Sequence, residues 1–314
     1  MTVGQPVLIA AELRNLLEPS QLNGLDVTWI AAEEPTPRGA FVALVPLLSR
    51  WVGGTELKHL PKLKIVANVA VGYNNVDVVA AEMRQVIVTN TPDVLTDATA
   101  DVTWALILAC ARRVIEGVDL IRSGQWKGWH PEQLLGLELR GRTLGLLGAG
   151  RIGQAVGLRA QAFGMNVLYS TRNPKPKFEE ETGAARVELS RLFRDSDVLS
   201  LHVPAVPELK GVINRDTLAQ MKPGAILVNT SRGDLVREEH LAAALEEGRL
   251  GAAGLDVYTE EPAIHPRLLI APRAVLLPHI GSATRDTRRR MAAIALENVQ
   301  AVLTGAPPLT PVFR

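Results

Sequence analysis

Short apolar runs of strand length alternate along the chain with longer stretches whose apolar positions follow a helical period. In the first third of the chain, the spacing of these runs leaves room for a helix between consecutive strands. The strand candidates are Val7–Ala10, Val27–Ile30, Phe41–Leu44, Lys64–Val69 and Val86–Thr89. Strands that alternate with helices usually form parallel sheets, because each helix carries the chain back to the starting edge. The pattern therefore predicts a small parallel sheet with helices around it.

A second series of the same kind begins at residue 143. It follows a long apolar-periodic helix expected at Asp97–Arg122 and an irregular arm rich in Trp and Gly at Ser123–Arg140. Its strands are expected near 143–147, 166–170, 198–202, 225–229, 251–255 and 274–277. Six strands in this alternation match a complete dinucleotide-binding sheet. The predicted fold class is therefore α/β, with two Rossmann-like, doubly wound parallel-sheet domains, the first of them flavodoxin-like.

The last helical pattern, Arg285–Leu303, is surplus to the second sheet. One face of it is apolar, formed by Met291, Ile294, Ala295, Val299 and Val302. We expect this helix to return to the first domain, which is then discontinuous. The expected domains are 1–97 with 286–314, and 98–285, which includes the arm as 110–142. A cleft between two such domains is a common place for an active site.

The segment 148–153 has the pattern G-x-G-x-x-G and stands between a predicted strand and a helix expected at Gln154–Phe163. Glycines at these positions allow a tight turn and let backbone N–H groups approach a pyrophosphate at the helix N-terminus. In this context the motif predicts dinucleotide binding; the alternative is a turn that only packs a helix on a sheet. The residues expected to bind the dinucleotide here are Gly148, Gly150, Arg151, Ile152 and Gly153.

Three polar residues follow strands of the second series: Arg232, Glu261 and His279. Ligands of open α/β sheets bind beyond the carboxyl ends of the strands, so these side chains can converge. An Arg can hold a carboxylate through two hydrogen bonds. A His can protonate a carbonyl oxygen as hydride arrives, and a Glu bonded to it would favour its protonated form. Spacing alone leaves open that each is a solvated loop residue or a structural cap.

Composition narrows the range of partners. The formal net charge is +1, so no charge excess points to nucleic acid. The single cysteine, Cys110, suits a reducing compartment and lies in an apolar run typical of a buried position. We see no signal peptide, and the longest apolar run, Trp104–Ala111, is too short to span a bilayer. We therefore expect a cytoplasmic protein without nucleic-acid or membrane partners, and without a metal, because no Cys/His cluster has metal-ligand spacing.

Several segments, in the right order over nearly the whole chain, resemble the D-isomer-specific 2-hydroxyacid dehydrogenase family. Within it, the resemblance is closest to glyoxylate/hydroxypyruvate reductases and the related 2-ketogluconate reductases. The segments that carry it, besides the glycine motif, are Val69–Asp77, Asn90–Asp97, Asn229–Gly233, Gly254–Pro262, Leu277–Thr284, Leu47–Ser49 and Gly124–Trp129.

The resemblance implies roles for individual residues. The catalytic residues would be Arg232, His279 and Glu261, the last rather than Glu260 because it directly precedes Pro262. Asp256 would hold the nicotinamide carboxamide. Further cofactor contacts would come from Thr171, Arg172, His202, Val203, Pro204, Thr230, Ser231 and Gly281. Substrate would be bound by Arg232 with Leu48, Val71, Gly72 and Trp129. The family also implies a homodimer formed through the arm.

One departure concerns the cofactor. Enzymes of this fold that use NAD carry an acidic residue after the second strand, which binds the ribose 2′-hydroxyl. Thr171 stands at that position, and the neighbouring Arg172 would attract a 2′-phosphate. We therefore expect NADP(H) to be preferred over NAD(H); the alternative is that Arg172 is a solvated loop cation and NAD is used.

The expected function is NADPH-dependent reduction of a small 2-oxo acid to the D-2-hydroxy acid. Glyoxylate, hydroxypyruvate and 2-ketogluconate are the candidate substrates. Two alternatives remain open. One is a non-enzymatic dinucleotide-sensing protein on the same fold, like the C-terminal-binding-protein corepressors. The other is a dehydrogenase of the same family that acts on another substrate, such as phosphite or formate.

Overall fold

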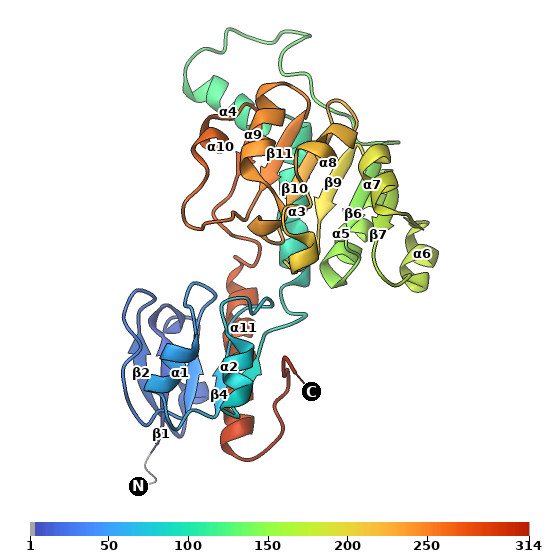
Figure 1. The fold of residues 1–314 in the computed structure, drawn as a ribbon. Coiled ribbons are helices and arrows are strands. Elements are labelled where there is room, and N and C mark those ends of the chain that lie inside the picture. The colour runs from blue at the N-terminus through green and yellow to red at the C-terminus, as the bar shows by residue number, and fades with distance from the viewer. Residues whose placement is uncertain (1–3, 314) are drawn as a thin grey trace. The chain divides into compact units, whose positions relative to one another are not determined.

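The computed structural model describes residues 4–313, which form two compact units (Figure 1). The first unit extends to Leu95 and takes up the chain again at Ser282, and the second is Thr96–Gly281. The sequence pattern predicted these divisions after residues 97 and 285. The observed divisions lie just before helices α3 (Thr96–Ala111) and α11 (Arg285–Leu303).

The first unit is built on a parallel sheet with the strand order β2-β1-β3-β4-β5. This is the flavodoxin-like doubly wound order. Its strands are β1 (Gln5–Ala10), β2 (Leu25–Ile30), β3 (Ala43–Val45), β4 (Ile65–Ala67) and β5 (Ile87–Thr89). Alternate side chains of β1 point to opposite faces, so that Val7 and Ile9 join a different core cluster from Leu8.

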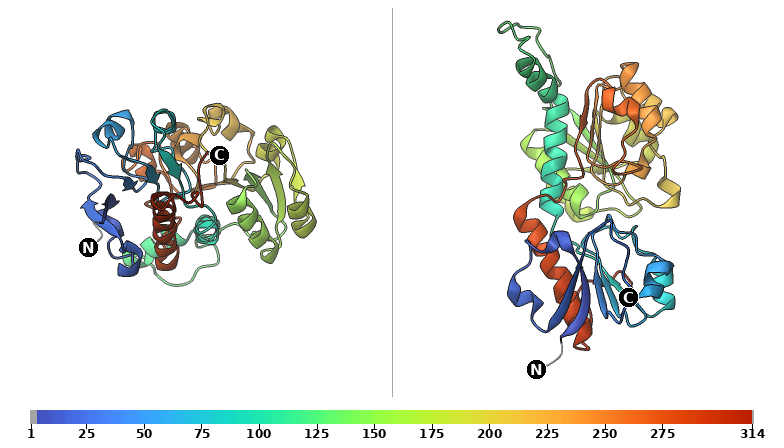
Figure 2. Two further views of the ribbon diagram at one scale, coloured as in Figure 1. Left: turned by 90° about the horizontal axis from the view of Figure 1, so that it is seen from below. Right: turned by 90° about the vertical axis from the view of Figure 1, so that its left-hand side faces the viewer.

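Each face of the first sheet has its own helical cover. The short helices α1 (Gly54–His59) and α2 (Val78–Met83) contribute to the cluster that contains Leu8. Helix α11 packs its apolar face on the cluster that contains Val7 and Ile9, as expected for a C-terminal helix that returns to the first sheet (Figure 2). The buried residues of this face are Met291, Ala292, Ala295, Leu296 and Val299.

The second unit contains a parallel sheet with the order β12-β11-β10-β9-β6-β7-β8. From β6 the chain adds β7 and β8 on one side, and then β9 to β12 on the other side of β6. The parallel pair β6 and β9 is therefore the switch point of a dinucleotide-binding fold. The strands are β6 (Thr143–Leu147), β7 (Asn166–Ser170), β8 (Ala185–Arg186), β9 (Val198–Leu201), β10 (Ile226–Asn229), β11 (Ala252–Leu255) and β12 (Ala274–Leu276). The two doubly wound parallel sheets confirm the predicted fold class. Strand β8 was not predicted from the sequence, because two residues are too few to show a period.

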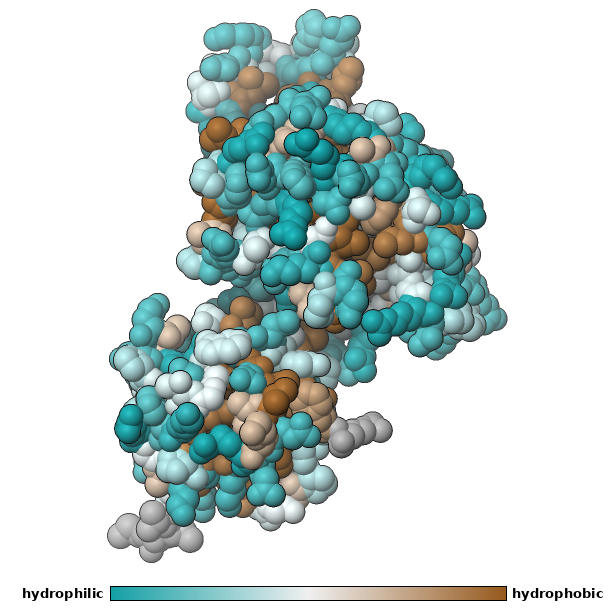
Figure 3. All heavy atoms as spheres, viewed as in Figure 1, coloured by the Kyte–Doolittle hydropathy of each residue, from teal (hydrophilic) through white to brown (hydrophobic). Residues whose placement is uncertain are grey.

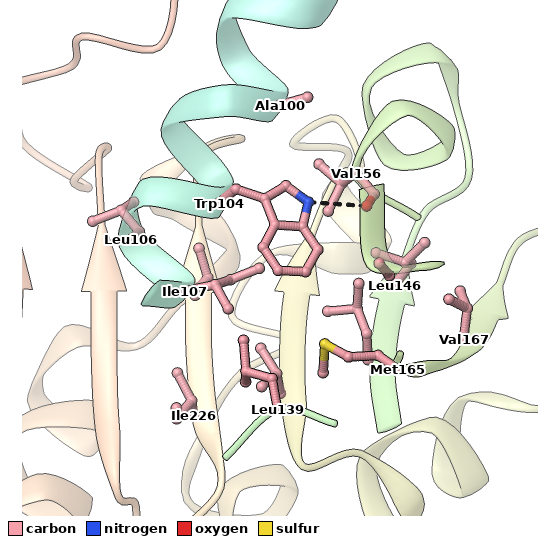
Figure 4. Packing of buried hydrophobic residues seen from close by; sticks show 14 of the residues in the cluster. Ala100, Trp104, Leu106, Ile107, Leu139, Leu146, Val156, Met165, Val167 and Ile226 are labelled. Carbon is pink, nitrogen blue, oxygen red and sulfur yellow. Dashed lines mark hydrogen bonds between the residues drawn. The ribbon is translucent and has the colours of Figure 1, made fainter. Parts of the chain in front are cut away.

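Helices cover both faces of the second sheet. Besides α3, the helices of this unit are α4 (Val114–Arg122), α5 (Arg151–Ala162), α6 (Pro176–Thr182), α7 (Leu189–Asp195), α8 (Arg215–Gln220), α9 (Glu238–Glu246) and α10 (Pro266–Ile270). Helices α3, α5 and α6 share one core cluster, and α7 to α10 share the other. Trp104 of α3 lies at the centre of the first cluster, where its indole N–H donates to the Val156 carbonyl at 3.0 Å (Figure 4).

The single long helix predicted at Asp97–Arg122 is wrong: the structure divides it into α3 and α4. Arg113 has a left-handed backbone with φ of 54°, which ends the α-helical path. The carbonyl of Ala111 accepts a hydrogen bond from Leu137 N–H at 2.8 Å instead of continuing the helical ladder. The returning arm thus supplies the partner for the end of α3, an interaction without a periodic sequence signal.

Two kinds of feature are absent from the described residues, 4–313. They contain no helix long and apolar enough to cross a membrane. Within the same range, no three His, Cys, Asp or Glu side chains are arranged to hold a metal ion.

Candidate active site

The glycine turn joins β6 to α5 at the switch point of the second sheet. Gly148 has a φ of 97°, and a Cβ built there would lie 2.5 Å from the carbonyl oxygen of His202. Gly153, in the first turn of α5, approaches the Gly148 carbonyl so closely that its Cβ would lie 2.2 Å away. Both positions therefore exclude any side chain.

The middle glycine differs from these two. A Cβ built on Gly150 would meet no atom within 4 Å, so the space beside this residue is open. Gly150 directly precedes α5, whose first residues are Arg151 and Ile152. The first N–H groups of a helix have no partner within the helix, and the helix dipole favours an anion there. This open cradle fits a pyrophosphate group.

The loop after β7 holds the residues expected to select the cofactor. Arg172 is exposed, and the hydroxyl of Thr171 donates to the Asn173 carbonyl at 2.7 Å. Arg186 of β8 donates to the carbonyls of Thr171 at 3.1 Å and Arg172 at 2.8 Å. No acidic side chain occupies positions 171–173. Arg186 carries no signal in the sequence, because its partners are backbone carbonyls and no residue pattern reveals them.

The segment after β9 connects the glycine turn to the loop after β10. Burial lowers the pKa of His202 to about 3, so the ring is neutral near pH 7, and its Nε2 lies 2.9 Å from the Ser200 hydroxyl. The carbonyl of the next residue, Val203, accepts a hydrogen bond from the Ser231 hydroxyl. The structure thus places His202 and Val203 beside the glycine turn. The hydroxyl of Thr230, in the loop after β10, lies 2.8 Å from that of Thr103 of α3.

Arg232 lies in the loop that follows β10. The buried Asn229 shapes this loop, because its amide donates to the Arg232 carbonyl at 2.9 Å and its oxygen accepts from Ser231 N–H at 3.0 Å. The guanidinium donates to the carbonyl of Ser231 at 2.6 Å. Burial lowers the pKa of Arg232, and the negative charge of Glu261 partly offsets this effect.

Glu261 and His279 form a direct pair. Nδ1 of His279 lies 2.7 Å from one carboxylate oxygen of Glu261, and the other oxygen accepts from Tyr258 N–H at 2.9 Å. Burial alone would raise the pKa of Glu261, but the hydrogen bonds from His279 and Tyr258 and the nearby Arg232 outweigh it, and the pKa is lowered. The carboxylate is therefore ionised and oriented toward the ring. His279 itself has a left-handed backbone with φ of 54°.

Asp256 stands at the end of β11 with its side chain buried. Its two oxygens accept the N–H groups of Ile280 and Gly281, each at 2.7 Å. Burial raises its pKa, although these hydrogen bonds and the nearby His279 act in the opposite direction. Asp256 thus fixes the backbone directly after His279, and the carbonyl of Gly281 in turn accepts from the Thr99 hydroxyl at 3.2 Å.

The remaining candidates lie elsewhere in the chain. In the first unit, the carbonyl of Val71 accepts from the Asn90 amide at 2.8 Å, and that of Gly72 accepts from the Asn68 amide at 2.9 Å. Leu48 belongs to the same unit and is exposed. In the arm of the second unit, Trp129 is 84% exposed. A role in substrate binding for these four residues stays a prediction.

The second unit has the strand order, switch point and glycine cradle of the dinucleotide-binding α/β proteins, and this defines the class of the protein. Comparison with known proteins agrees. Residues 104–281 match the family model described as "D-isomer specific 2-hydroxyacid dehydrogenase, NAD binding domain". The chain is 48% identical over 291 residues to a glyoxylate reductase of Thermococcus litoralis, covering 89% of this chain and 88% of that protein.

Solved structures give the same result. The TT0316 protein of Thermus thermophilus has a TM-score of 0.90 and 45% identity, with 98% of this chain and 99% of that chain covered. An NADPH-dependent glyoxylate/hydroxypyruvate reductase of Sinorhizobium meliloti, solved with NADP and malonate, has a TM-score of 0.86 and 33% identity over 99% and 97% of the two chains. The chain belongs to the family of D-isomer specific 2-hydroxyacid dehydrogenases, which confirms the resemblance noted in the sequence, and its cofactor is a nicotinamide dinucleotide.

Proposed function

We propose that this protein is an NADPH-dependent reductase of a small 2-oxo acid, with glyoxylate and hydroxypyruvate as the leading substrates. The observation that carries the proposal is the 2.7 Å pair between His279 and Glu261, a carboxylate whose pKa the charge of Arg232 also lowers. Reduction of a 2-oxo acid requires a general acid, a carboxylate that orients this acid, and a cation that binds the substrate.

The roles follow from this geometry. A dinucleotide held by the glycine turn after β6 would supply the hydride that reduces the carbonyl carbon of the substrate. Because Nδ1 of His279 is engaged by Glu261, its Nε2 is the nitrogen that donates a proton to the substrate oxygen. Arg232 binds the substrate carboxylate through its planar guanidinium and stabilises the negative charge that develops on the oxygen. In the oxidative direction, His279 accepts the proton.

The candidate substrates are proposed from the names of similar proteins. The Thermococcus litoralis protein is named a glyoxylate reductase, and the Sinorhizobium meliloti protein a glyoxylate/hydroxypyruvate reductase. The larger 2-ketogluconate is the third candidate, supported only by the resemblance of sequence segments. On the same basis we propose that Leu48, Val71, Gly72 and Trp129 contact the substrate.

NADPH preference is supported by the loop after β7. Thr171 stands where a carboxylate would repel a 2′-phosphate, and the exposed Arg172 offers a cation at the adjacent position. Arg186 holds the carbonyls of both residues and adds a second positive charge to this loop. A structural relative solved with NADP is consistent with this interpretation.

We also propose a homodimer formed through the arm. Helix α4 exposes four apolar side chains, of which Val114, Val118 and Ile121 recur at helical spacing beside Ile115. Trp126 and Trp129 of the following arm are exposed as well. Hydrophobic atoms are visible among polar ones at the top of Figure 3, where α4 and the arm lie in Figure 1. Exposed apolar groups gathered in this way are typical of a protein–protein interface.

A substrate panel tests the proposed function. Glyoxylate, hydroxypyruvate, 2-ketogluconate and pyruvate are each assayed with NADPH and with NADH by the loss of absorbance at the nicotinamide band. The proposal expects the highest kcat/KM for one of the first two acids with NADPH. Absence of turnover with every acid and both cofactors would contradict it, and would favour a dinucleotide-sensing role.

A further inference from the structure

The loop that carries Glu261 is held by the segment that follows Arg232. A Cβ built on Gly233 would lie 1.9 Å from the carbonyl carbon of Tyr258 and 2.3 Å from the nitrogen of Thr259. The Tyr258–Thr259 peptide therefore packs directly on the backbone of Gly233. The two loops that bear Arg232 and Glu261 are thus in contact through their main chains.

A second attachment comes from Glu238, the first residue of α9. One oxygen of its carboxylate accepts the N–H of Thr259 at 2.7 Å, and the other accepts the N–H of His265 at 3.2 Å. Glu261 lies between these two points in the chain. A single half-buried carboxylate therefore fixes both ends of the loop that presents the partner of His279. The position of Glu238 in the first turn of a helix favours its negative charge.

We propose that Glu238 is a positioning residue for the reaction, acting through Glu261. This inference rests on the proposed role of the Glu261–His279 pair. Glu238 holds the Tyr258–Thr259 peptide through the N–H of Thr259. Tyr258, the first residue of this peptide, donates its own N–H to Glu261 at 2.9 Å. Glu261 in turn bonds His279 at 2.7 Å. Movement of the Tyr258–Thr259 peptide would shift the carboxylate away from the ring.

The competing explanation is that Glu238 only anchors a surface loop, which would affect stability but not the chemistry. The two explanations differ in the pH dependence of reduction. The charges that act on Glu261 are those of His279 and Arg232, and Glu261 in turn acts on Asp256. Glu238 bonds Thr259 and His265, and its charge also acts on Tyr258. A change in pH profile caused by a substitution at Glu238 therefore reports on the loop when substitution of the neighbouring Glu239, which removes an equal charge, leaves the profile unchanged.

The test compares Glu238→Gln with Glu239→Gln, a matched control on the same helical turn whose side chain is exposed. Gln keeps one acceptor oxygen and so retains one of the two loop contacts. We expect kcat for glyoxylate reduction to fall about tenfold in Glu238→Gln, because a displaced Glu261 carboxylate no longer holds the His279 ring in its reactive orientation. Cofactor KM and the thermal midpoint should change little, and Glu239→Gln should match the unmodified protein.

The pH profile and a double variant decide how Glu238 acts. In Glu261→Gln, the pH at which reduction loses half its rate should move to lower values, because the charge that favours protonated His279 is gone. Glu238→Gln should move it in the same direction by a smaller amount. The double variant Glu238→Gln/Glu261→Gln should be no slower than Glu261→Gln alone, because both changes act through one group.

Two results would overturn the inference. One is normal kcat and an unchanged pH profile in Glu238→Gln; the other is a double variant whose losses multiply. A failure of the proposed function is recognised separately, because the unmodified protein would then turn over none of the 2-oxo acids, or His279→Ala would retain its activity. If His279→Ala is inactive while Glu238→Gln behaves as the unmodified protein, His279 is supported as the acid and the positioning role of Glu238 is refuted.

Discussion

At the residue scale, the properties of the candidate catalytic groups depend on their immediate neighbours. Glu261 would be harder to ionise in its half-buried position, but His279, Tyr258 N–H and Arg232 lower its pKa. Because the folded-state pKa of Glu261 is lowered, the stabilisation from its ionised carboxylate is present above the pKa that Glu261 has in the unfolded chain. It is lost as the pH falls through the folded value. The carboxylate is therefore ionised under neutral conditions.

Arg232 is predicted to recognise the substrate by shape as well as charge. Lys at this position keeps the positive charge but loses the planar fork that bonds a carboxylate twice. We expect Arg232→Lys to lower kcat/KM for glyoxylate by about 100-fold, near 2.7 kcal/mol, while binding of NADPH is retained. Steady-state kinetics together with a cofactor titration measure this. Equal kcat/KM in the two proteins would show that Arg232 makes no bidentate contact.

The loop after β7 predicts cofactor choice. We expect kcat/KM with NADPH to exceed that with NADH by about tenfold or more, which one charge-assisted hydrogen bond to the 2′-phosphate can supply. Arg172→Ala should remove most of this preference by weakening NADPH and not NADH. Thr171→Asp should go further, because a carboxylate repels the phosphate. The preference should also fall at high salt, since Arg172 is exposed. Kinetics that favour NADH in the unmodified protein would refute the assignment.

The candidate residues that can be predicted from the sequence are those whose side-chain type matches the expected chemistry, whereas residues that bond backbone groups carry no such signal. Arg232, Glu261 and His279 follow strand ends, so the fold class alone predicts that they converge. Glu238 and Arg186 bond backbone groups of distant loops, and neither a motif nor a period marks them. Only the folded chain shows which carbonyls and N–H groups they meet.

At the element scale, the apolar periods of the sequence predict the regular helices and strands, whereas tertiary contacts decide where a helix is interrupted. Every strand predicted in the first third of the chain and in the second series has a counterpart in the two sheets. The division between α3 and α4 depends on Leu137 N–H meeting the Ala111 carbonyl, a contact between residues far apart in the chain. β8 is too short to show alternation. These features are set by partners that a local pattern does not contain.

Helix α11 offers a test of how its C-terminal extension is held. The buried Asn298 accepts the N–H groups of Leu309 and Thr310 and donates to the Thr310 hydroxyl at 2.9 Å. We expect Asn298→Ala to lower the free energy of unfolding by about 1–3 kcal/mol, because these groups lose their partner. Chemical denaturation measures this.

The neighbouring Glu297 provides the control for this experiment. Its carboxylate pairs with Arg290 at 2.7 Å in a partly exposed ion pair. Glu297→Ala should therefore change the free energy of unfolding by no more than about 0.5 kcal/mol. Equal effects of the two substitutions would show that Asn298 does not hold the extension.

At the scale of the whole molecule, the proposed dimer is the next prediction. Light scattering at micromolar concentration should give twice the mass of the chain. Val118→Glu and Ile121→Glu place charges on the exposed apolar face of α4, so together they should produce a monomer. A matched change on another helix, Met83→Glu at an exposed position of α2, should leave the dimer intact. A monomeric unmodified protein would refute the interface.

The central claim is that His279, oriented by Glu261, is the acid in reduction of a 2-oxo acid. The most direct measurement is single-turnover reduction of glyoxylate by NADPH in the unmodified protein and in His279→Ala. We expect the variant to bind NADPH with unchanged affinity and to fold normally, while its rate falls by at least about 100-fold, the lower end of a general-acid contribution. A variant that retains a near-normal single-turnover rate would contradict the account, because the proton would then come from another group.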